Sequence, residues 1–179
     1  MTSRIVRSVF ATRQASISDA PVIGDVLVRS AQFAYAQIAS PEYLAALDPA
    51  EKADEYERLL PLQKDGHYAV ILALDDNMPL GFAEIEMTHD GDGARIGVLQ
   101  RMFFVPESLG RGLAPVLHQA VIETLARWGC SEAELTFVKG NERARSFYRK
   151  QGWIETGQIR PFDDHVRTLY DIVMRRLVP

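Results

Sequence analysis

The sequence has one cysteine, no excess of basic charge and no long apolar run. With Cys130 alone among 179 residues, an internal disulfide framework and a zinc site built on thiolates are excluded. Lys and Arg number 20 against 24 Asp and Glu, and the formal net charge of -4 speaks against a nucleic-acid or anionic-membrane partner. No apolar run approaches the ~20 residues that span a bilayer, and the four histidines are scattered. We therefore expect a cytoplasmic protein without a metal.

The remaining composition is typical of a single globular domain. Apolar residues make up 47% of the chain and charged residues 25%, which are ordinary values for folded proteins. A chain of 179 residues is long enough to remove roughly 70% of its surface from water around one core. No repeat or linker divides it, so we expect one domain over residues 1–179.

Hydrophobic periodicity and turn residues predict the order β-α-α-α-β-β-β-α-β-α-β-β, which indicates a mixed α/β layer structure. Residues 1–18 contain several Arg, Ser and Thr and no acidic residue, as organelle transit peptides do, but a first strand is the better interpretation. The expected strands cover residues 8–14, 67–74, 80–88, 95–105, 132–138, 153–160 and 168–174, and the expected helices cover 19–38, 41–47, 49–60, 113–128 and 141–151.

Strand 95–105, helix 113–128 and strand 132–138 form a βαβ unit. A right-handed crossover makes the two strands parallel, and adjacent or nearly so. The loops after both strands then emerge at one edge of the sheet, where open α/β sheets bind ligands. Each loop leads into a helix amino terminus, whose free amides attract anions. The loops around 110–114 and around Asn141 are therefore predicted to share one crevice.

The first of these loops has the residues that a diphosphate site needs. Pro106 ends strand pairing, and Arg111 adds a cation. Gly110 and Gly112 permit close approach of the backbone to a ligand. An ordinary glycine-containing connector is the alternative interpretation. The loop lacks the Gly-Lys-Ser/Thr ending of a P-loop, and Pro115 occupies the place of the third glycine in the dinucleotide fingerprint.

Two sequence motifs lie in order on these predicted elements. Gly112 and Ala114 match the last two places of Gln/Arg-x-x-Gly-x-Gly/Ala. The second motif, Asn-x-x-Ala-x-x-x-Tyr-x-x-x-Gly, is matched by Asn141, Ala144, Tyr148 and Gly152. With both motifs the chain resembles the GNAT superfamily of acyl-CoA-dependent N-acetyltransferases, and the resemblance covers most of its length.

The resemblance implies a fold and a co-substrate. The fold is a mixed, mostly antiparallel sheet with a central parallel βαβ unit and helices on both faces. The co-substrate is acetyl-CoA, and no metal is implied. Leu109 departs from the usual Gln or Arg of the first motif, and Pro115 removes one amide just past it. Because the family binds the diphosphate mainly through backbone amides, we expect fewer contacts rather than lost binding.

The resemblance also implies roles for individual residues. Backbone groups of Phe103 and Val105 are expected to pair with the pantetheine arm, and the Arg111 side chain to help hold the diphosphate. Asn141 is expected to contact the arm, and its alternative role as a plain helix cap is compatible with this. The residues implied in cofactor binding are Phe103, Phe104, Val105, Leu109, Gly110, Arg111, Gly112, Leu113, Ala114 and Asn141.

An acid and a base complete the expected site. By the resemblance, Tyr148 offers a proton to the departing CoA thiolate; the alternative is a tyrosine that only fills the core. Period-two alternation places Phe82, Glu84 and Glu86 on one face of their strand. Glu84 is the candidate base, with Glu86 behind it, and solvated strand charges are the alternative. His118 is expected opposite the apolar stripe of its helix, without a catalytic role.

The implied function is transfer of acetyl from acetyl-CoA to a primary amine of a small molecule or peptide by direct attack. A non-catalytic acyl-CoA-binding sensor or assembly subunit of the same fold is the alternative. The expected partner is the amine substrate, with a homodimer as an option, and neither nucleic acid nor membrane. The acceptor pocket is expected near Phe33, Tyr35, Tyr43 and residues 162–165.

Overall fold

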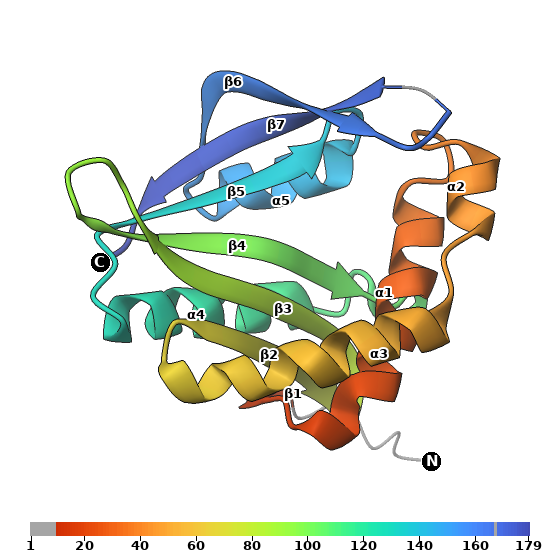
Figure 1. The fold of residues 1–179 in the computed structure, drawn as a ribbon, viewed down its shortest axis with the longest axis horizontal. Coiled ribbons are helices and arrows are strands. Elements are labelled where there is room, and N and C mark those ends of the chain that lie inside the picture. Colours follow the sequence, from red (N-terminus) through yellow and green to blue (C-terminus); the bar gives the residue numbers. More distant parts are fainter. Residues whose placement is uncertain (1–9, 167) are drawn as a thin grey trace, which may run out of the picture.

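The computed structural model describes residues 10–166 and 168–179, which form a seven-stranded sheet with helices on both faces (Figure 1). The strand order is β1-β2-β3-β4-β5-β7-β6, and β4–β5 is the parallel pair among antiparallel ones. This confirms the predicted mixed, mostly antiparallel sheet with a central βαβ unit. The strands are β1 (Phe10–Gln14), β2 (Tyr68–Asp75), β3 (Met78–His89), β4 (Arg95–Phe104), β5 (Glu132–Val138), β6 (Ile154–Asp163) and β7 (Thr168–Leu177).

The helices divide between the two faces of the sheet (Figure 1). Helices α1 and α3 pack on one face, and α4 and α5 lie on the other, each face with its own apolar cluster. Phe82 belongs to the first cluster, and Ala83 and Ile85 belong to the second, as the period-two alternation of β3 predicts. The α-helices are α1 (Ala20–Ala34), α2 (Pro41–Ala45), α3 (Pro49–Leu59), α4 (Leu113–Arg127) and α5 (Glu142–Lys150), with 3-10 turns at Ile17–Asp19, Leu60–Asp65 and Pro106–Ser108.

The predicted elements are present, with differences at their ends. Helix α1 stops at Ala34 instead of residue 38, because the chain turns after Tyr35, whose carbonyl accepts a hydrogen bond from Ile38 N at 2.8 Å. Strands β6 and β7 are longer than expected because they pair with each other as a hairpin. Residues 8 and 9 of the expected first strand, and the basic residues before them, lie outside the described residues. No helix in the described ranges is long and apolar enough to cross a membrane.

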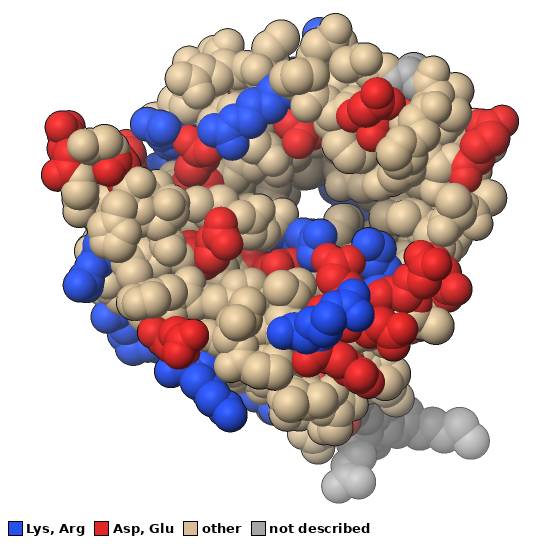
Figure 2. Space-filling model, in the orientation of Figure 1, with Lys and Arg blue, Asp and Glu red and all other residues tan. Residues whose placement is uncertain are grey.

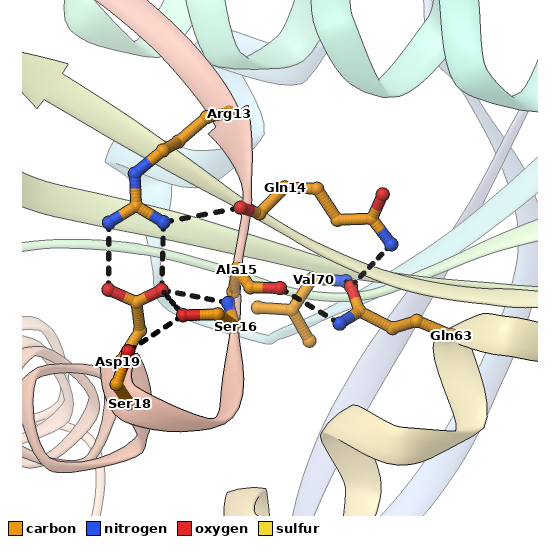
Figure 3. Close-up of polar contacts among 8 residues, drawn as sticks. All are labelled: Arg13, Gln14, Ala15, Ser16, Ser18, Asp19, Gln63 and Val70. Atoms are coloured by element: carbon orange, nitrogen blue, oxygen red, sulfur yellow. Dashed lines mark hydrogen bonds and ion pairs between the residues drawn. The ribbon is translucent and has the colours of Figure 1, made fainter.

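The start of α1 is attached to the end of β1 by a compact polar cluster (Figure 3). Both terminal nitrogens of Arg13 donate to the carboxylate of Asp19 at 2.7 Å, and Ser16 N donates to the same carboxylate at 2.8 Å. The Arg13 guanidinium holds the pKa of Asp19 well below its usual range. Nearby, Val70 N donates to Gln63 Oε1 at 3.0 Å, which ties β2 to the turn after α3. These bonds join the end of β1 to the start of α1, and β2 to the turn after α3.

The parallel strands β4 and β5 separate partway along their length. They pair from Ile96–Glu132 to Leu99–Leu135 and not beyond. At the same point the register between β3 and β4 shifts, and Gln100 is left as the extra residue of a bulge. Bulges bend a strand and increase its twist. The carboxyl-terminal halves of β4 and β5 therefore diverge and leave a gap in the sheet.

Candidate active site

The diverging strands β4 and β5 open a cleft of about 1040 Å³. Its wall combines the end of α1, β4 beyond the bulge, the loop before α4, β5 and the start of α5, so the two βα loops share one crevice as the topology predicts. Figure 2 shows an opening through the molecule here, with charged side chains gathered along its lower edge. The expected site residues that line the cleft are Phe103, Phe104, Leu109, Gly110, Gly112, Leu113, Ala114, Asn141 and Tyr148.

The loop before α4 forms the cleft wall at two left-handed glycines. Gly110 has a φ of 77° and Gly112 a φ of 95°, a conformation that other residues rarely adopt. Gly112 is the N-cap of α4, so the unpaired amides of the first helical turn and the positive end of the helix dipole lie at the cleft. This arrangement suits a diphosphate. Pro115, which also lines the cleft, lacks the amide that another residue would offer.

The Arg111 side chain forms an ion pair within the protein. Its Nη2 donates to Oδ2 of Asp75, at the end of β2. Arg111 is not among the residues that line the cleft. Asp75 is buried, and its Oδ1 has no partner among the described residues, so the guanidinium is needed to balance a buried carboxylate. The Arg111 guanidinium is therefore engaged by Asp75, and its expected contact with a diphosphate stays a prediction.

The backbone groups that face the gap belong to Met102 and Phe104. Val105 N donates to Leu80 O on β3 at 2.9 Å. Since successive residues of a strand direct their N–H and C=O to opposite sides, Phe103, two residues before Val105, also directs its backbone groups to β3. The expected pairing of an extended ligand with the backbone of Phe103 and Val105 is therefore wrong. The backbone N–H and C=O groups of Met102 and Phe104 are directed toward β5 instead, and both residues line the cleft.

Helix α5 begins at the cleft with Asn141. The side chain of Asn141 accepts a hydrogen bond from Ala144 N at 3.1 Å, so its role as a helix cap is confirmed. Asn141 also lines the cleft. Contact between Asn141 and the arm of a cofactor stays a prediction, which this position allows.

Tyr148 lies two turns further along α5 and is both a core residue and part of the cleft wall. It is 7% exposed and packs edge to face on Phe147 and Trp153, with ring centroids 5.4 and 6.0 Å away. No described residue forms a hydrogen bond with its hydroxyl. The described side-chain oxygens that are fully buried without a partner are those of Ser30 and Asp75. The Tyr148 hydroxyl therefore reaches the open space of the cleft.

The protonation of Tyr148 suits an acid. Burial raises the pKa of its phenol above the ordinary value of 10.0, and the nearby Tyr35 hydroxyl raises it further. The phenol therefore keeps its proton at neutral pH. A group that donates a proton to a leaving thiolate needs this protonation state. Tyr148 as the catalytic acid stays a prediction, and its position and protonation are those that the role requires.

Glu84 belongs to a buried polar network between α3 and the sheet. It is 6% exposed, so the interpretation as a solvated strand charge is wrong for Glu84, whereas Glu86 is half-exposed. Hydroxyls of Tyr56 and Tyr68 donate to the Glu84 carboxylate at 2.7 and 3.0 Å. Arg101 Nη1 donates to it at 2.8 Å. Glu84 as the base stays a prediction, but these three donors occupy its oxygens, and it is not among the residues that line the cleft.

His118 was expected outside the apolar stripe of α4, and this expectation is wrong. It is 2% exposed, and its Nε2 accepts a hydrogen bond from Trp153 Nε1 at 2.9 Å. Burial lowers the pKa of His118 to about 4, so the imidazole is neutral. Its partner is 35 residues away along the chain, and no local pattern in the sequence points to it.

Two further polar residues of the cleft wall were not predicted. Ser30 on α1 is 3% exposed, and its hydroxyl has no partner among the described residues. Arg101 on β4 also lines the cleft. Neither belongs to a motif. Both reach the cleft because α1 packs against β4 at the point where β4 leaves β5.

The residues expected near the acceptor pocket fall into two groups. One group lies at the end of α1, in the cleft wall, and the other lies close to the β6–β7 hairpin. Phe33 and Tyr35 line the cleft. Tyr43 on α2 packs edge to face on Phe162 of β6, with ring centroids 5.8 Å apart. His165 is exposed in the connection between β6 and β7. The structure therefore brings Phe33 and Tyr35 to the cleft and leaves the others outside its lining.

Comparisons with known proteins agree with this geometry. The model of the acetyltransferase (GNAT) family matches residues 33–153. An uncharacterized N-acetyltransferase of Mycobacterium tuberculosis is 27% identical over 137 residues, which are 76% of this chain and 84% of that protein.

Solved structures share the fold. PaiA N-acetyltransferase from Thermoplasma acidophilum, in complex with coenzyme A, has a TM-score of 0.75 and 22% identity, and the match covers 94% of this chain and 99% of that one. YncA from Salmonella typhimurium, with its cofactor acetyl-CoA, has a TM-score of 0.72 and 16% identity over 96% of this chain and 95% of that one. Since the family match covers residues 33–153 of a 179-residue sequence, the chain belongs to the GNAT acetyltransferase family.

Proposed function

We propose that this protein transfers the acetyl group of acetyl-CoA to a primary amine of a small molecule or peptide, by direct attack of the amine on the thioester. The observation that carries the proposal is the convergence of the glycine-containing loop and Tyr148 on one cleft, where β4 and β5 separate. One part of the wall offers backbone amides to a diphosphate. Another part offers a phenol to a leaving thiolate.

The residues of the cleft fit acetyl-CoA in two respects. Gly110 and Gly112 place backbone, without side chains, where the diphosphate would lie. The strand edge of Met102 and Phe104 can pair with the pantetheine arm as a further strand would. Bound there, acetyl-CoA supplies an activated thioester carbonyl.

Tyr148 would donate its proton to the sulfur that leaves. The hydroxyl reaches the cleft without a competing acceptor among the described residues, so its proton is directed to whatever binds there. The rings of Phe147 and Trp153 hold the phenol in place. Proton transfer by a positioned side chain contributes typically ~10²–10⁴ to a rate.

The amine must be unprotonated when it attacks. Glu84 is the base expected from the sequence, although its donors leave it little capacity for a further proton. Holding amine and thioester together in one cleft contributes up to ~7–11 kcal/mol by orientation alone. The proposed transfer therefore does not depend on Glu84 acting as the base.

Turnover of acetyl-CoA with a panel of primary amines tests the proposal. Release of the CoA thiol would be followed with a thiol reagent and the acetylated product by mass spectrometry; the single cysteine is buried and does not interfere. We expect saturable thiol release that depends on one class of amine. Tight acetyl-CoA binding without thiol release from any amine would favour a sensor or assembly subunit. Failure to bind acetyl-CoA would contradict the proposal itself.

A further inference from the structure

We infer that the amine substrate also carries a carboxylate, and that Arg101 binds this carboxylate in the cleft. The inference rests on the proposed acetyl transfer and adds to it a class of acceptor, namely small amino acids and related zwitterions. Three observations carry it: the bonding of the Arg101 guanidinium, the buried network that holds it, and an acidic residue across the gap.

One side of the Arg101 guanidinium, formed by Nε and Nη2, has no partner among the described residues of the cleft wall. Its side chain is 33% exposed and lines the cleft. Nη1 donates to Glu84 at 2.8 Å, to Glu55 at 3.1 Å and to Tyr56 at 3.1 Å. Nε and Nη2 donate to no described residue. These two nitrogens form the side-on pair with which arginine binds a carboxylate through two parallel hydrogen bonds.

The network beneath Arg101 fixes the guanidinium before any ligand arrives. The Tyr56 hydroxyl donates to one oxygen of Glu84 at 2.7 Å, and the Tyr68 hydroxyl donates to the other at 3.0 Å. Arg101 Cζ lies over the Tyr56 ring, 5.9 Å from its centroid. A binding group that is already ordered loses little side-chain entropy when a ligand binds. Arg101 is therefore preorganised for a carboxylate.

A purely structural role for Arg101 would be to balance Glu84 and Glu55. Lys52 Nζ, 2.7 Å from Glu55 Oε2, shares that task. Arg101 uses only Nη1 for these ion pairs. The structural role therefore accounts for one nitrogen of the guanidinium and leaves the other two available to a ligand.

Across the gap from β4, a negative group lies behind the cleft wall. Asp171 on β7 is half-buried and forms a hydrogen bond with Thr136, which lines the cleft. Tyr35, also in the cleft wall, experiences both charges: burial and Asp171 raise the pKa of its hydroxyl, and Arg101 acts in the opposite sense. Asp171 itself is not among the residues that line the cleft and lies behind Thr136, so it contributes a negative potential on the side of the gap opposite Arg101. An acceptor whose carboxylate binds Arg101 and whose ammonium lies toward Thr136 complements this arrangement of charge.

Matched pairs of acceptors test the inference. Each amino acid would be compared with the amine that lacks its carboxylate, for example phenylalanine with phenethylamine and lysine with cadaverine, by kcat/KM at saturating acetyl-CoA. We expect the best amino acid to be preferred by ~10- to 100-fold, the range of a charged hydrogen-bonded contact. In Arg101→Gln the preference should disappear, and Arg101→Lys should retain part of it. Arg95→Gln, on the same strand, is the matched control and should keep the full preference.

A second measurement needs no variant. 3-Phenylpropionate should compete with the acceptor in the wild-type protein, and 3-phenylpropanol should not. Preference for the decarboxylated amines, equal inhibition by acid and alcohol, or a preference that survives in Arg101→Gln would overturn the inference. Each of these results leaves acetyl transfer itself intact, whereas a wild-type protein that binds no acetyl-CoA would contradict the proposed function.

Discussion

The two faces of the sheet contribute different kinds of group to the cleft. On the face of α4 and α5, the groups are set by neighbouring residues, because Gly112 and Asn141 are the N-caps of the two helices. On the face of α1 and α3, side chains from distant segments meet: Arg101 contacts Glu55, 46 residues away, and Glu84, 17 residues away. Under the proposed function, the first face supplies the groups for cofactor binding and chemistry, and the second supplies a buried polar network and the side chain proposed to select the acceptor.

The largest expected effect lies on the face of α4 and α5. Tyr148→Phe should lower kcat by ~10²–10⁴ through loss of the proton donor, with the Kd of acetyl-CoA unchanged because the ring still packs on Phe147 and Trp153. Steady-state kinetics and calorimetric titration measure the two quantities. Tyr170→Phe, at an exposed tyrosine of β7, is the control and should alter neither. A large loss of affinity with unchanged kcat would instead assign Tyr148 to packing.

Gly112→Asp should weaken acetyl-CoA binding by ~1,000-fold, about 4 kcal/mol. The substitution strains the left-handed backbone at the N-cap of α4 and places a carboxylate beside the expected diphosphate. Calorimetric titration measures the loss, and circular dichroism checks the fold. Gly91→Asp, in a hairpin where an added Cβ meets nothing within 4 Å, is the matched control. If Gly112→Asp still bound acetyl-CoA with micromolar affinity, this loop would not be the diphosphate site.

On the face of α1 and α3, Glu84→Gln should cost about 3 kcal/mol of unfolding free energy, because it leaves Arg101 without a buried counter-charge. Chemical denaturation measures the loss. Glu86→Gln, at the half-exposed neighbour on the same strand, should change stability by less than ~0.5 kcal/mol. A Glu84→Gln protein of wild-type stability with kcat/KM lowered 100-fold or more would restore Glu84 as the base.

Acid should weaken the packing of α4 through His118. In the unfolded chain His118 takes up a proton near pH 6.5, and in the folded protein only near pH 4. Between these values the unfolded state binds more protons, so stability falls as the pH falls, by up to about 3 kcal/mol. Denaturation curves at pH 7 and pH 4.5 measure the loss. His118→Gln keeps an acceptor for Trp153 and should reduce this loss of stability between pH 7 and pH 4.5. An equal loss in the wild-type and variant proteins would show that His118 is not the group that titrates.

The smallest expected effect separates the two roles considered for Arg111. Because its side chain pairs with Asp75, Arg111→Ala should lower the free energy of unfolding and leave the Kd of acetyl-CoA within about threefold, or ~0.7 kcal/mol. Thermal unfolding and calorimetric titration on the same sample distinguish the outcomes. A fall in affinity of 30-fold or more at unchanged stability would support the expected contact of Arg111 with the diphosphate.

The errors in the predicted site have a common physical cause. Gly112, Asn141 and Tyr148 were predicted where backbone conformation and helical spacing place them. His118 was misjudged because Trp153, the partner that decides where its side chain points, comes from another element. The Asp75 partner of Arg111, also from another element, was missed for the same reason. The backbone of Val105 was misassigned because the side to which a strand residue directs its N–H depends on the neighbouring strand with which it pairs.

The sequence alone determined the order of strands and helices, the parallel βαβ unit and the glycine-containing loop, since periodicity, caps and turns act over a few residues. The tertiary structure decided where β4 leaves β5, which backbone groups face the resulting cleft, and that Arg101 reaches it with one edge unused. The physical reason is that burial and charge pairing depend on distances through space, and the residues that set those distances lie tens of positions apart along the chain.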